Sequence, residues 1–352
     1  MTDEAATVAH IDLALVDECL ERFFVVSSAR AQAFGRPSEE LWRVLRKASM
    51  GGKRFRPRMV LTAYAGLGGT DVHAASHVAA AYELLHTALV VHDDVIDRDW
   101  SRRGQPNVAG SFRDTGTTGG LPLPTAEHRG MSAAVIAGDL ALSGAPRFIE
   151  SSGVDGDRRT RLLDLFDDAV FASAAGEMAD VDLTHGVMPT VDEVLAMERA
   201  KTSVYSFEAP LQSGAVLAGA DESIVTALGA FGREIGIAYQ VVDDLLGVFG
   251  DEAATGKTAI GDLREGKRTM LIAYAATTEC WAELAPYLGD PDLTEERAAE
   301  MRRLLVHCGA HDAALVRVRE HTALARAELA ALPFDLADRL ETLVSELVER
   351  VR

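Results

Sequence analysis

The sequence has few of the features that mark several large classes of protein. Three cysteines in 352 residues, Cys19, Cys280 and Cys308, lie far apart without a CxxC pair, which disfavours a disulfide framework or a cysteine zinc site. Basic charge is in deficit, with a net charge of −19, so we expect no nucleic acid partner, because a phosphate backbone binds basic surfaces. No apolar run reaches the roughly 18 residues of a membrane span, and MTDEAATVAH at the start lacks a signal-peptide pattern. We therefore expect a cytoplasmic protein without a membrane span.

A helical pattern is what the sequence has in abundance. Apolar residues make up 48% of the chain, enough for a sizeable core. They recur at three- and four-residue spacing, for example at Leu340, Leu343, Val344 and Leu347, while alternating β-branched runs are scarce. We predict an all-α fold of roughly ten or more helices in a single domain over residues 1–352. The stretch 104–130, rich in glycine and proline, is predicted to be a mobile loop.

A first acidic cluster follows a strongly apolar segment. The segment over residues 79–91 leads directly into Asp93, Asp94 and Asp97. On a helix, Asp93 and Asp97 share one face, where their like charges repel. A hard cation offsets that repulsion, and Mg²⁺ usually takes one or two carboxylates together with substrate phosphates. Taken alone, this DDxxD motif is more often a solvated helix end than a metal site.

A second acidic cluster repeats the arrangement far along the chain. Residues 238–251 read AYQVVDDLLGVFGD, so another apolar helix leads to adjacent carboxylates, Asp243 and Asp244. Two independent occurrences strengthen each other, because an apolar helix does not readily carry uncompensated charge. Carboxylates on facing helices of a bundle could bind metal ions from opposite walls of one cavity.

Cations are concentrated in four places in this acidic chain. These are Lys53, Arg54, Arg56 and Arg58 beside two glycines; Arg102 and Arg103; Lys201; and Lys257 with Lys267 on either side of Asp262. Arginine binds phosphate through a bidentate fork and lysine acts as a point charge. One such group alone is more often a salt-bridged surface patch. Beside two acidic clusters, the four groups indicate two bound anions, and the absence of GxxxxGK[ST] disfavours a nucleotide loop.

In this order, the segments resemble the motifs of the trans-isoprenyl diphosphate synthase (polyprenyl synthetase) family. GGKRFRP, HDDVIDRDWSRRG, KTSVYSF, YQVVDD and DLREGKRT stand where that family has its motifs, and the resemblance runs from about residue 47 to 269. It implies the isoprenoid synthase fold, a helical bundle around a central cavity, and a homodimer. It also implies Mg²⁺-dependent head-to-tail condensation of isopentenyl diphosphate with an allylic diphosphate.

The resemblance assigns a role to each motif residue. Asp93, Asp97 and Asp243 would bind Mg²⁺, about three ions per site with Mn²⁺ as a substitute, and Asp94 and Asp244 belong to the same motifs. Further roles are implied for contacts to the allylic diphosphate (Lys201, Lys257, Arg102), to isopentenyl diphosphate (Lys53, Arg56, His86, Arg103), to the reaction centre (Thr202, Tyr205, Gln240) and for a position near the mouth of the site (Lys267).

Two positions depart from the family pattern. Gly247 stands where the second motif usually has its last aspartate, and Asp251 or Asp262 could supply the missing outer charge. Glu177 stands where many relatives have glutamine, with Asp180 as the usual residue beside it. Because the first aspartate of the motif carries the metal contact in the family, we expect activity to survive.

Product length depends on the residues one helical turn before the first motif. Bulky aromatic residues there stop growth early in related enzymes, whereas this chain has Ala88 and Leu89. We therefore predict geranylgeranyl diphosphate as the product, with a farnesyl or longer-chain synthase as the alternative. A class I terpene cyclase or a non-catalytic prenyltransferase subunit fits less well, because both aspartate motifs and the GGKR cations are present.

Overall fold

The structure, a computed structural model, describes residues 13–250 and 260–350. The chain divides into two compact units, Met1–Phe166 with Ser213–Gly219, and Asp167–Gln212 with Ala220–Arg352. Helices hold most of the described residues, and the strands among them are two of two residues each, so the predicted all-α class is confirmed. The single domain predicted over 1–352 stays a prediction, and each unit is described by itself.

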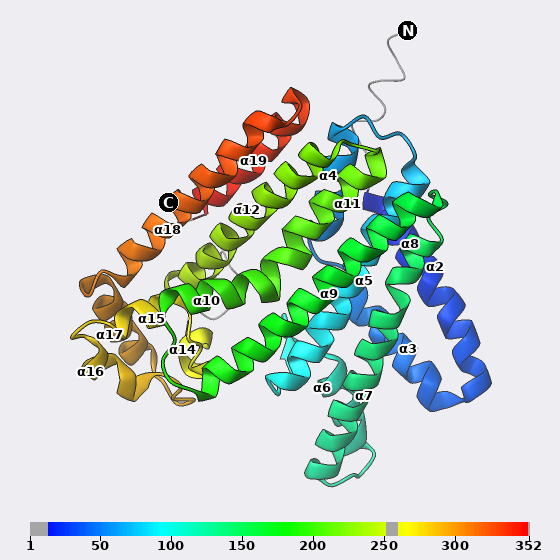
Figure 1. The fold of residues 1–352 in the computed structure, drawn as a ribbon. Helices are drawn as coiled ribbons and strands as arrows, with labels where there is room; N and C mark the ends of the chain where they lie inside the picture. The colour runs from blue at the N-terminus through cyan, green and yellow to red at the C-terminus, as the bar shows by residue number, and fades with distance from the viewer. Residues whose placement is uncertain (1–12, 251–259, 351–352) are drawn as a thin grey trace. The chain divides into compact units, whose positions relative to one another are not determined.

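The first unit is built around the long helix α5 (Figure 1). It contains α2 (Leu13–Ala31), η1 (Gln32–Phe34), α3 (Arg36–Ser49), α4 (Phe55–Gly66), α5 (Val72–Ile96), β1 (Ser101–Arg102), β2 (Gln105–Pro106), α6 (Val108–Thr118), α7 (Leu123–Gly144), α8 (Pro146–Glu150), the start of α9 (Gly156–His185) and the end of α11 (Ala209–Ala218). Helix α5 packs against α2, α4, α7 and α8. Its fully buried side chains include Tyr82, Leu84 and Leu85, so α5 is the core helix of the unit.

Helix α5 is also long and apolar enough to cross a membrane, judged by length and composition alone. Its most apolar stretch is, however, 78% buried inside the structure. The core helix of a globular unit meets the same criterion, because burial against protein and burial in lipid both select apolar side chains. The expected absence of a membrane span therefore stays a prediction.

The stretch 104–130 is helical over most of its length, which corrects the predicted loop. It forms α6 and the start of α7, and these two helices pack as a hairpin (Figure 1). The side chain of Asn107 caps α6 by accepting a hydrogen bond from Gly110 N, 2.8 Å away. Pro124 lies in the first turn of α7, where proline is tolerated. Gly130 has no Cβ to collide with Ala109 O, so the helices approach closely. The predicted mobility of the stretch stays a prediction.

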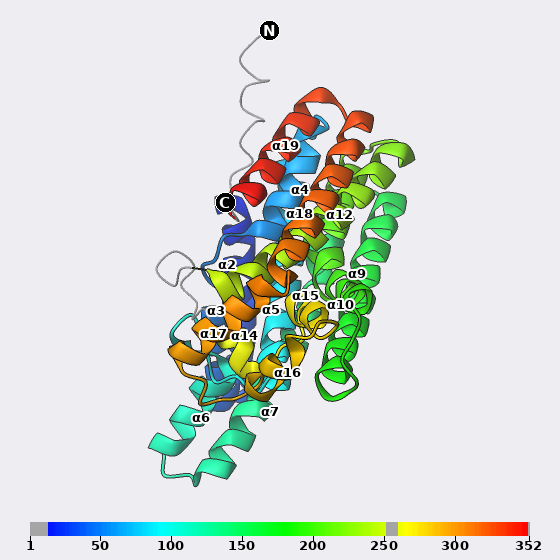
Figure 2. The ribbon, with the colours of Figure 1, turned by 90° about the vertical axis from the view of Figure 1, so that its left-hand side faces the viewer.

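The second unit is centred on α12 (Glu222–Phe249). It contains the rest of α9 and α11, α10 (Val191–Glu198), η2 (Arg199–Glu208), α12, α14 (Gly261–Glu265), α15 (Met270–Ala275), α16 (Trp281–Leu284), η3 (Ala285–Tyr287), α17 (Glu295–His307), α18 (Ala310–Glu328), η4 (Leu329–Ala331) and α19 (Phe334–Glu349). Helix α12 lies beside α18 (Figure 2) and also packs against η2. Phe231 and Val242 of α12 are fully buried at the centre of this packing.

Candidate active site

The first acidic motif occupies the last turn of α5. The helix persists through the motif, because Asp97 N donates to Asp93 O at 2.9 Å, and the two carboxylates therefore share a face. Arg98 then takes a left-handed conformation (φ 59°) and Asp99 N donates to Asp94 O at 2.8 Å, which terminates the helix. Asp97 is exposed, Asp93 is half-buried and Asp94 is buried, so the three carboxylates at the end of the helix differ in solvent exposure.

A short hairpin brings Arg102 back onto these carboxylates. Strands β1 and β2 pair across Arg103 and Gly104, both with positive φ, as a type I′ turn requires. The guanidinium of Arg102 donates to Asp94 Oδ1 at 2.9 Å and to Asp93 Oδ2 at 3.2 Å. Burial raises the pKa of Asp94 to about 6, although the charge of Arg102 opposes the rise. Keeping this buried carboxylate ionised therefore costs free energy, and a bound cation would reduce that cost.

The GGKR loop before α4 is fixed by its own arginine. Gly51 and Gly52 have φ of 78° and 87°, a conformation that favours glycine. Arg54 is buried and donates to Glu83 Oε1 at 2.7 Å and to Asp17 Oδ1 at 2.8 Å. Replacing it would leave the buried Glu83 without its counter-ion, a loss of about 3–5 kcal/mol. Arg54 therefore holds the loop in place rather than presenting its charge to a substrate.

His86 lies among the remaining cations of this unit. Burial lowers the pKa of His86 well below its usual value, and Arg56, Arg102 and Arg103 lower it further. The guanidinium of Arg103 lies close to Gly52, with nitrogen atoms 3.6 and 3.7 Å from the position that a Cβ would take. Three arginines thus lie near enough to His86 to lower its pKa, and such a cluster favours a bound anion. The structure brings together most of the residues that the resemblance assigned to isopentenyl diphosphate, and Lys53 lies exposed on the same loop.

The KTSVYSF motif of the second unit forms a π-helix. Element η2 runs from Arg199 to Glu208 in this form, which is rare and occurs frequently at functional sites. Neighbouring glycines make room for its wider backbone: a Cβ on Gly236 would lie 2.5 Å from Ser203 Cβ, and one on Gly232 would lie 2.7 Å from Glu208 Cα. Thr202 is half-buried and Tyr205 is buried. The sequence gives no periodicity signal for this geometry.

Two carboxylates of α9 bind Lys201. Its Nζ lies 2.6 Å from Asp180 Oδ2 and 3.1 Å from Glu177 Oε2. Gly176 permits this approach, because a Cβ there would overlap the backbone of Lys201. Glu177, noted in the sequence only as a departure with no assigned effect, therefore adds a second negative charge beside the lysine.

The second acidic motif lies on α12 with a further buried carboxyl beside it. Gln240 Nε2 donates to Asp244 Oδ1 at 3.3 Å. Burial raises the pKa of Asp244 to about 7, although hydrogen bonds with Glu198 and Gln240 oppose the rise. Burial and the adjacent Asp244 raise the pKa of Glu198 well above its usual range. Sequence reasoning missed Glu198, since a lone glutamate near a helix end carries no motif.

Asp243 has a partner from the other end of the unit. Arg350, next to the C-terminal end of α19, donates to Asp243 Oδ1 at 2.8 Å, and its guanidinium carbon lies 4.9 Å from the ring centroid of Tyr239. The sequence could not predict this pair, because 107 residues separate its members. Lys267 pairs with Glu265 at 2.9 Å and with Asp262 at 3.6 Å. Lys257, predicted to contact the allylic diphosphate, lies outside the described residues.

The donor set suits a hard divalent cation. Both acidic motifs offer carboxylate oxygens, the ligands that Mg²⁺ prefers. Apart from the Glu198 carboxyl, no described group donates to the buried Oδ2 of Asp244, and a cation would satisfy this oxygen once both carboxyls are ionised. No group of three or more His, Cys, Asp or Glu is preformed as a metal site among the described residues. Incomplete protein ligation is usual for Mg²⁺, which takes further oxygens from water and phosphate.

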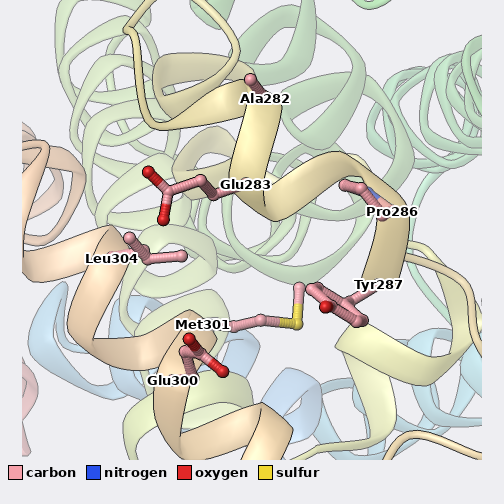
Figure 3. Close-up of a pocket in the computed structure, with 7 residues that line it drawn as sticks. All are labelled: Ala282, Glu283, Pro286, Tyr287, Glu300, Met301 and Leu304. Carbon is pink, nitrogen blue, oxygen red and sulfur yellow. The ribbon is translucent and has the colours of Figure 1, made fainter.

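A small pocket of the second unit lies away from these residues. It has a volume of about 210 Å³ and is lined by side chains of α16, η3 and α17, among them Glu283, Tyr287 and Met301 (Figure 3). None of the motif residues lines it, and its volume is below that of ordinary ligand sites, about 300–1,000 Å³. The pocket is therefore not a candidate for the reaction.

Comparison with known proteins decides the family. The model of the polyprenyl synthetase family matches residues 38–304, well over half of the chain. The chain belongs to the polyprenyl synthetase family. It is 33% identical over 309 residues to a geranylfarnesyl diphosphate synthase of Aeropyrum pernix, covering 86% of this chain and 91% of the relative.

Solved structures of the family agree. A geranylgeranyl pyrophosphate synthase from Corynebacterium glutamicum, complexed with isoprenyl diphosphate and magnesium, superposes with a TM-score of 0.90 at 29% identity, covering 97% of this chain and 99% of that one. A polyprenyl synthase from Caulobacter crescentus, complexed with calcium and isoprenyl diphosphate, gives a TM-score of 0.76 at 27% identity, with 100% and 99% covered. The predicted isoprenoid synthase fold and trans-prenyltransferase activity are confirmed.

Proposed function

We propose that this polyprenyl synthetase condenses isopentenyl diphosphate with allylic diphosphates to make geranylgeranyl diphosphate, using Mg²⁺, about three ions per site. The observation that carries the proposal is the convergence of Arg56, Arg102 and Arg103 on His86 in the same unit as the first aspartate motif. A cluster of cations beside the carboxylates of the first aspartate motif favours a bound diphosphate. The neighbouring carboxylates suit the metal that such a substrate carries.

The proposed chemistry divides the residues into two groups. Lys53, Arg56, His86 and Arg103 hold the diphosphate of isopentenyl diphosphate, while Arg102, Lys201 and Lys257 contact the allylic diphosphate. Asp93, Asp97 and Asp243 would hold Mg²⁺, which would neutralise the charge of the leaving diphosphate. Once the allylic diphosphate replaces Glu177 and Asp180 as the partner of Lys201, the lysine adds a positive charge beside the same diphosphate. Thr202, Tyr205 and Gln240 line the reaction centre, and Lys267 lies near its mouth.

No protein nucleophile is needed for the condensation. Loss of diphosphate leaves an allylic carbocation, which the double bond of isopentenyl diphosphate attacks, and the released diphosphate accepts the final proton. Water would quench the cation, so apolar surroundings protect it. The α5 residues that precede the first motif provide such surroundings, because Leu85 and Ala88 are fully buried and Leu89 is half-buried.

Ala88 supports the proposed product length. It lies about one helical turn before Asp93, and its methyl group is small. A growing chain that follows α5 therefore meets no large side chain at this position. The A. pernix relative is named a geranylfarnesyl synthase and the C. glutamicum structure a geranylgeranyl synthase, names that fit a site open beyond the farnesyl length. The alternative is a farnesyl or longer-chain synthase.

A product assay tests the proposal. The purified chain is incubated with Mg²⁺, isopentenyl diphosphate and each allylic primer, and the dephosphorylated products are identified by mass spectrometry. We expect geranylgeraniol as the main product, and Ala88→Phe should shorten it because packed interiors rarely accept an added ring. Val72→Phe, at an exposed position of the same helix, is the matched control and should not change the product.

Two other results would contradict parts of the proposal. No product from the folded chain with any primer would favour the non-catalytic subunit. An unchanged product in an active Ala88→Phe variant would mean that the chain grows along another route. We also propose a cytoplasmic homodimer, which analytical ultracentrifugation tests by a mass of twice that of the chain.

A further inference from the structure

The π-helix η2 is longer than most helices of this form. It covers Arg199–Glu208, which is about two turns, whereas π-helices mostly occur as single turns within α-helices. At its end, Ala209 N donates to Val204 O, five residues earlier, as the π form requires. Because this form is rare, interactions outside the backbone must stabilise the second turn.

One ion pair joins the two ends of η2. Arg199 Nε donates to Glu208 Oε1 at 3.1 Å, and Arg199 Nη2 donates to Glu208 Oε2 at 3.5 Å. The side chain of Glu208 is only 10% exposed, so its charge depends on a partner inside the protein. The first residue of the π-helix thus supplies the counter-ion for the last residue.

The spacing of this pair fits the π form and not the α form. The two residues are nine positions apart, and in an α-helix nine residues make about two and a half turns, which places them on opposite faces. In a π-helix, whose hydrogen bonds join residues five apart, nine residues make about two whole turns, which places them on one face. The ion pair therefore stabilises the π form relative to the α form.

The form of η2 sets the relative orientation of the motif residues within it. Lys201, Thr202 and Tyr205 lie between the two members of the pair. A change from the π to the α form would turn Tyr205 by about a fifth of a turn relative to Lys201. Such a displacement of groups that contact a reacting substrate lowers the rate, because catalysis depends on their alignment.

We propose that Arg199 and Glu208 are positioning residues for the condensation, because their ion pair holds η2 in the π form and so keeps Lys201 and Tyr205 aligned. This inference rests on the proposed function, since it concerns the residues assigned to the allylic substrate. A second arginine, Arg233 of α12, has its Nε 3.9 Å from Glu208 Oε2. Arg233 joins Glu208 to another helix rather than to the start of η2, and it therefore offers a matched control.

Steady-state kinetics of two arginine variants test the proposal. Arg199→Gln and Arg233→Gln each remove one arginine from the same carboxylate, but only Arg199→Gln breaks the link along η2. Arg199→Gln should lower kcat/KM for the allylic diphosphate about tenfold or more, while KM for isopentenyl diphosphate stays within about twofold. Arg233→Gln should change both values by less than about twofold. Arg199→Lys keeps the charge beside Glu208, and its kcat/KM should stay within about threefold of that of the unchanged chain.

Two further measurements separate positioning from a purely structural role. In a Lys201→Ala background, Arg199→Gln should lower kcat/KM for the allylic diphosphate by no more than about twofold, because the residue through which the pair acts is gone. Hydrogen exchange of the free protein reports on the helix itself and needs no turnover. The backbone amides of residues 199–208 should exchange about tenfold faster in Arg199→Gln than in Arg233→Gln.

Three results would overturn the inference. Equal kinetic losses in the two arginine variants would show that the charge balance of Glu208 matters and the link along η2 does not. Equal amide exchange in the two variants would show that the pair does not hold the π-helix, whether or not the chain is active. A folded, unchanged chain that makes no product would refute the proposed function, and the positioning role would fail with it. Glu208→Gln keeps the shape of the side chain and should reproduce the loss, so it decides the matter if Arg199→Gln does not fold.

Discussion

Removal of Arg350 should strengthen metal binding at the second acidic motif. Arg350 donates to Asp243 Oδ1 at 2.8 Å, and Asp243 is the carboxylate assigned to the metal. A divalent cation that binds this oxygen must therefore displace the guanidinium. In the unchanged chain the metal must break the Arg350–Asp243 ion pair before it binds. Arg350→Ala removes that cost, so metal binding should become more favourable by the free energy of the pair.

The size of the effect follows from the exposure of the pair. The side chains of Arg350 and Asp243 are 36% and 33% exposed, and such ion pairs contribute about 0.2–1 kcal/mol. The contact of Arg350 with the ring of Tyr239 adds about 0.5 kcal/mol. A total of about 1 kcal/mol corresponds to a gain in affinity of about fivefold. The same loss should lower the stability of the metal-free chain by a similar amount.

Isothermal titration with Mn²⁺ alone, without diphosphate, is the assay, because it excludes any contact of Arg350 with substrate. Arg339→Ala is the matched control, since Arg339 is an exposed arginine of the adjoining helix α19 and its removal changes the net charge equally. The gain should appear in Arg350→Ala only. Equal affinities in the two variants, or weaker binding in Arg350→Ala, would refute the idea that the pair competes with the metal.

Four further outcomes are expected. Asp243→Ala should lower kcat at least about 100-fold through lost electrostatic stabilisation, and near-normal steady-state turnover would contradict its role. Arg56→Ala should raise KM for isopentenyl diphosphate more than KM for the allylic substrate. A larger rise for the allylic substrate in initial-rate kinetics would mean that the two diphosphate sites have been assigned the wrong way round. Burial and nearby arginines lower the pKa of His86 in the folded chain, so as pH falls below about 6.5 the unfolded chain takes up the proton first and stability is lost. Between pH 7.5 and 5.5, the free energy of unfolding of His86→Gln should fall by about 1.4 kcal/mol less than that of the unchanged chain, as measured by denaturant unfolding. Equal losses in the two proteins would show that folding does not lower the pKa of His86. Glu177→Gln should lower KM for the allylic diphosphate about two- to fivefold by releasing Lys201 from one ion pair, whereas an unchanged value would leave the glutamate without a role there.

Local sequence patterns were sufficient for the helices that carry the motifs. In α5 and α12 an apolar helical repeat ends in closely spaced aspartates, and side-chain spacing along a helix follows from its 3.6-residue period. The same reasoning failed over 104–130, where glycine and proline indicated a loop. There the Asn107 cap, a proline in the first helical turn and the packing of α6 on α7 outweigh the low intrinsic helix propensity.

The sequence by itself determined which residues carry charge in this protein, and which share a helix face, because both depend only on residue type and local period. Tertiary structure decided what each charge contacts. Arg54 and Arg56 are two residues apart in one basic loop, yet Arg54 is buried on Glu83 whereas Arg56 lies near His86. Asp262 lies in the space left by Gly247, although 15 positions separate them in the sequence. Such pairings arise from the packing of distant helices, and no local rule of spacing contains that information.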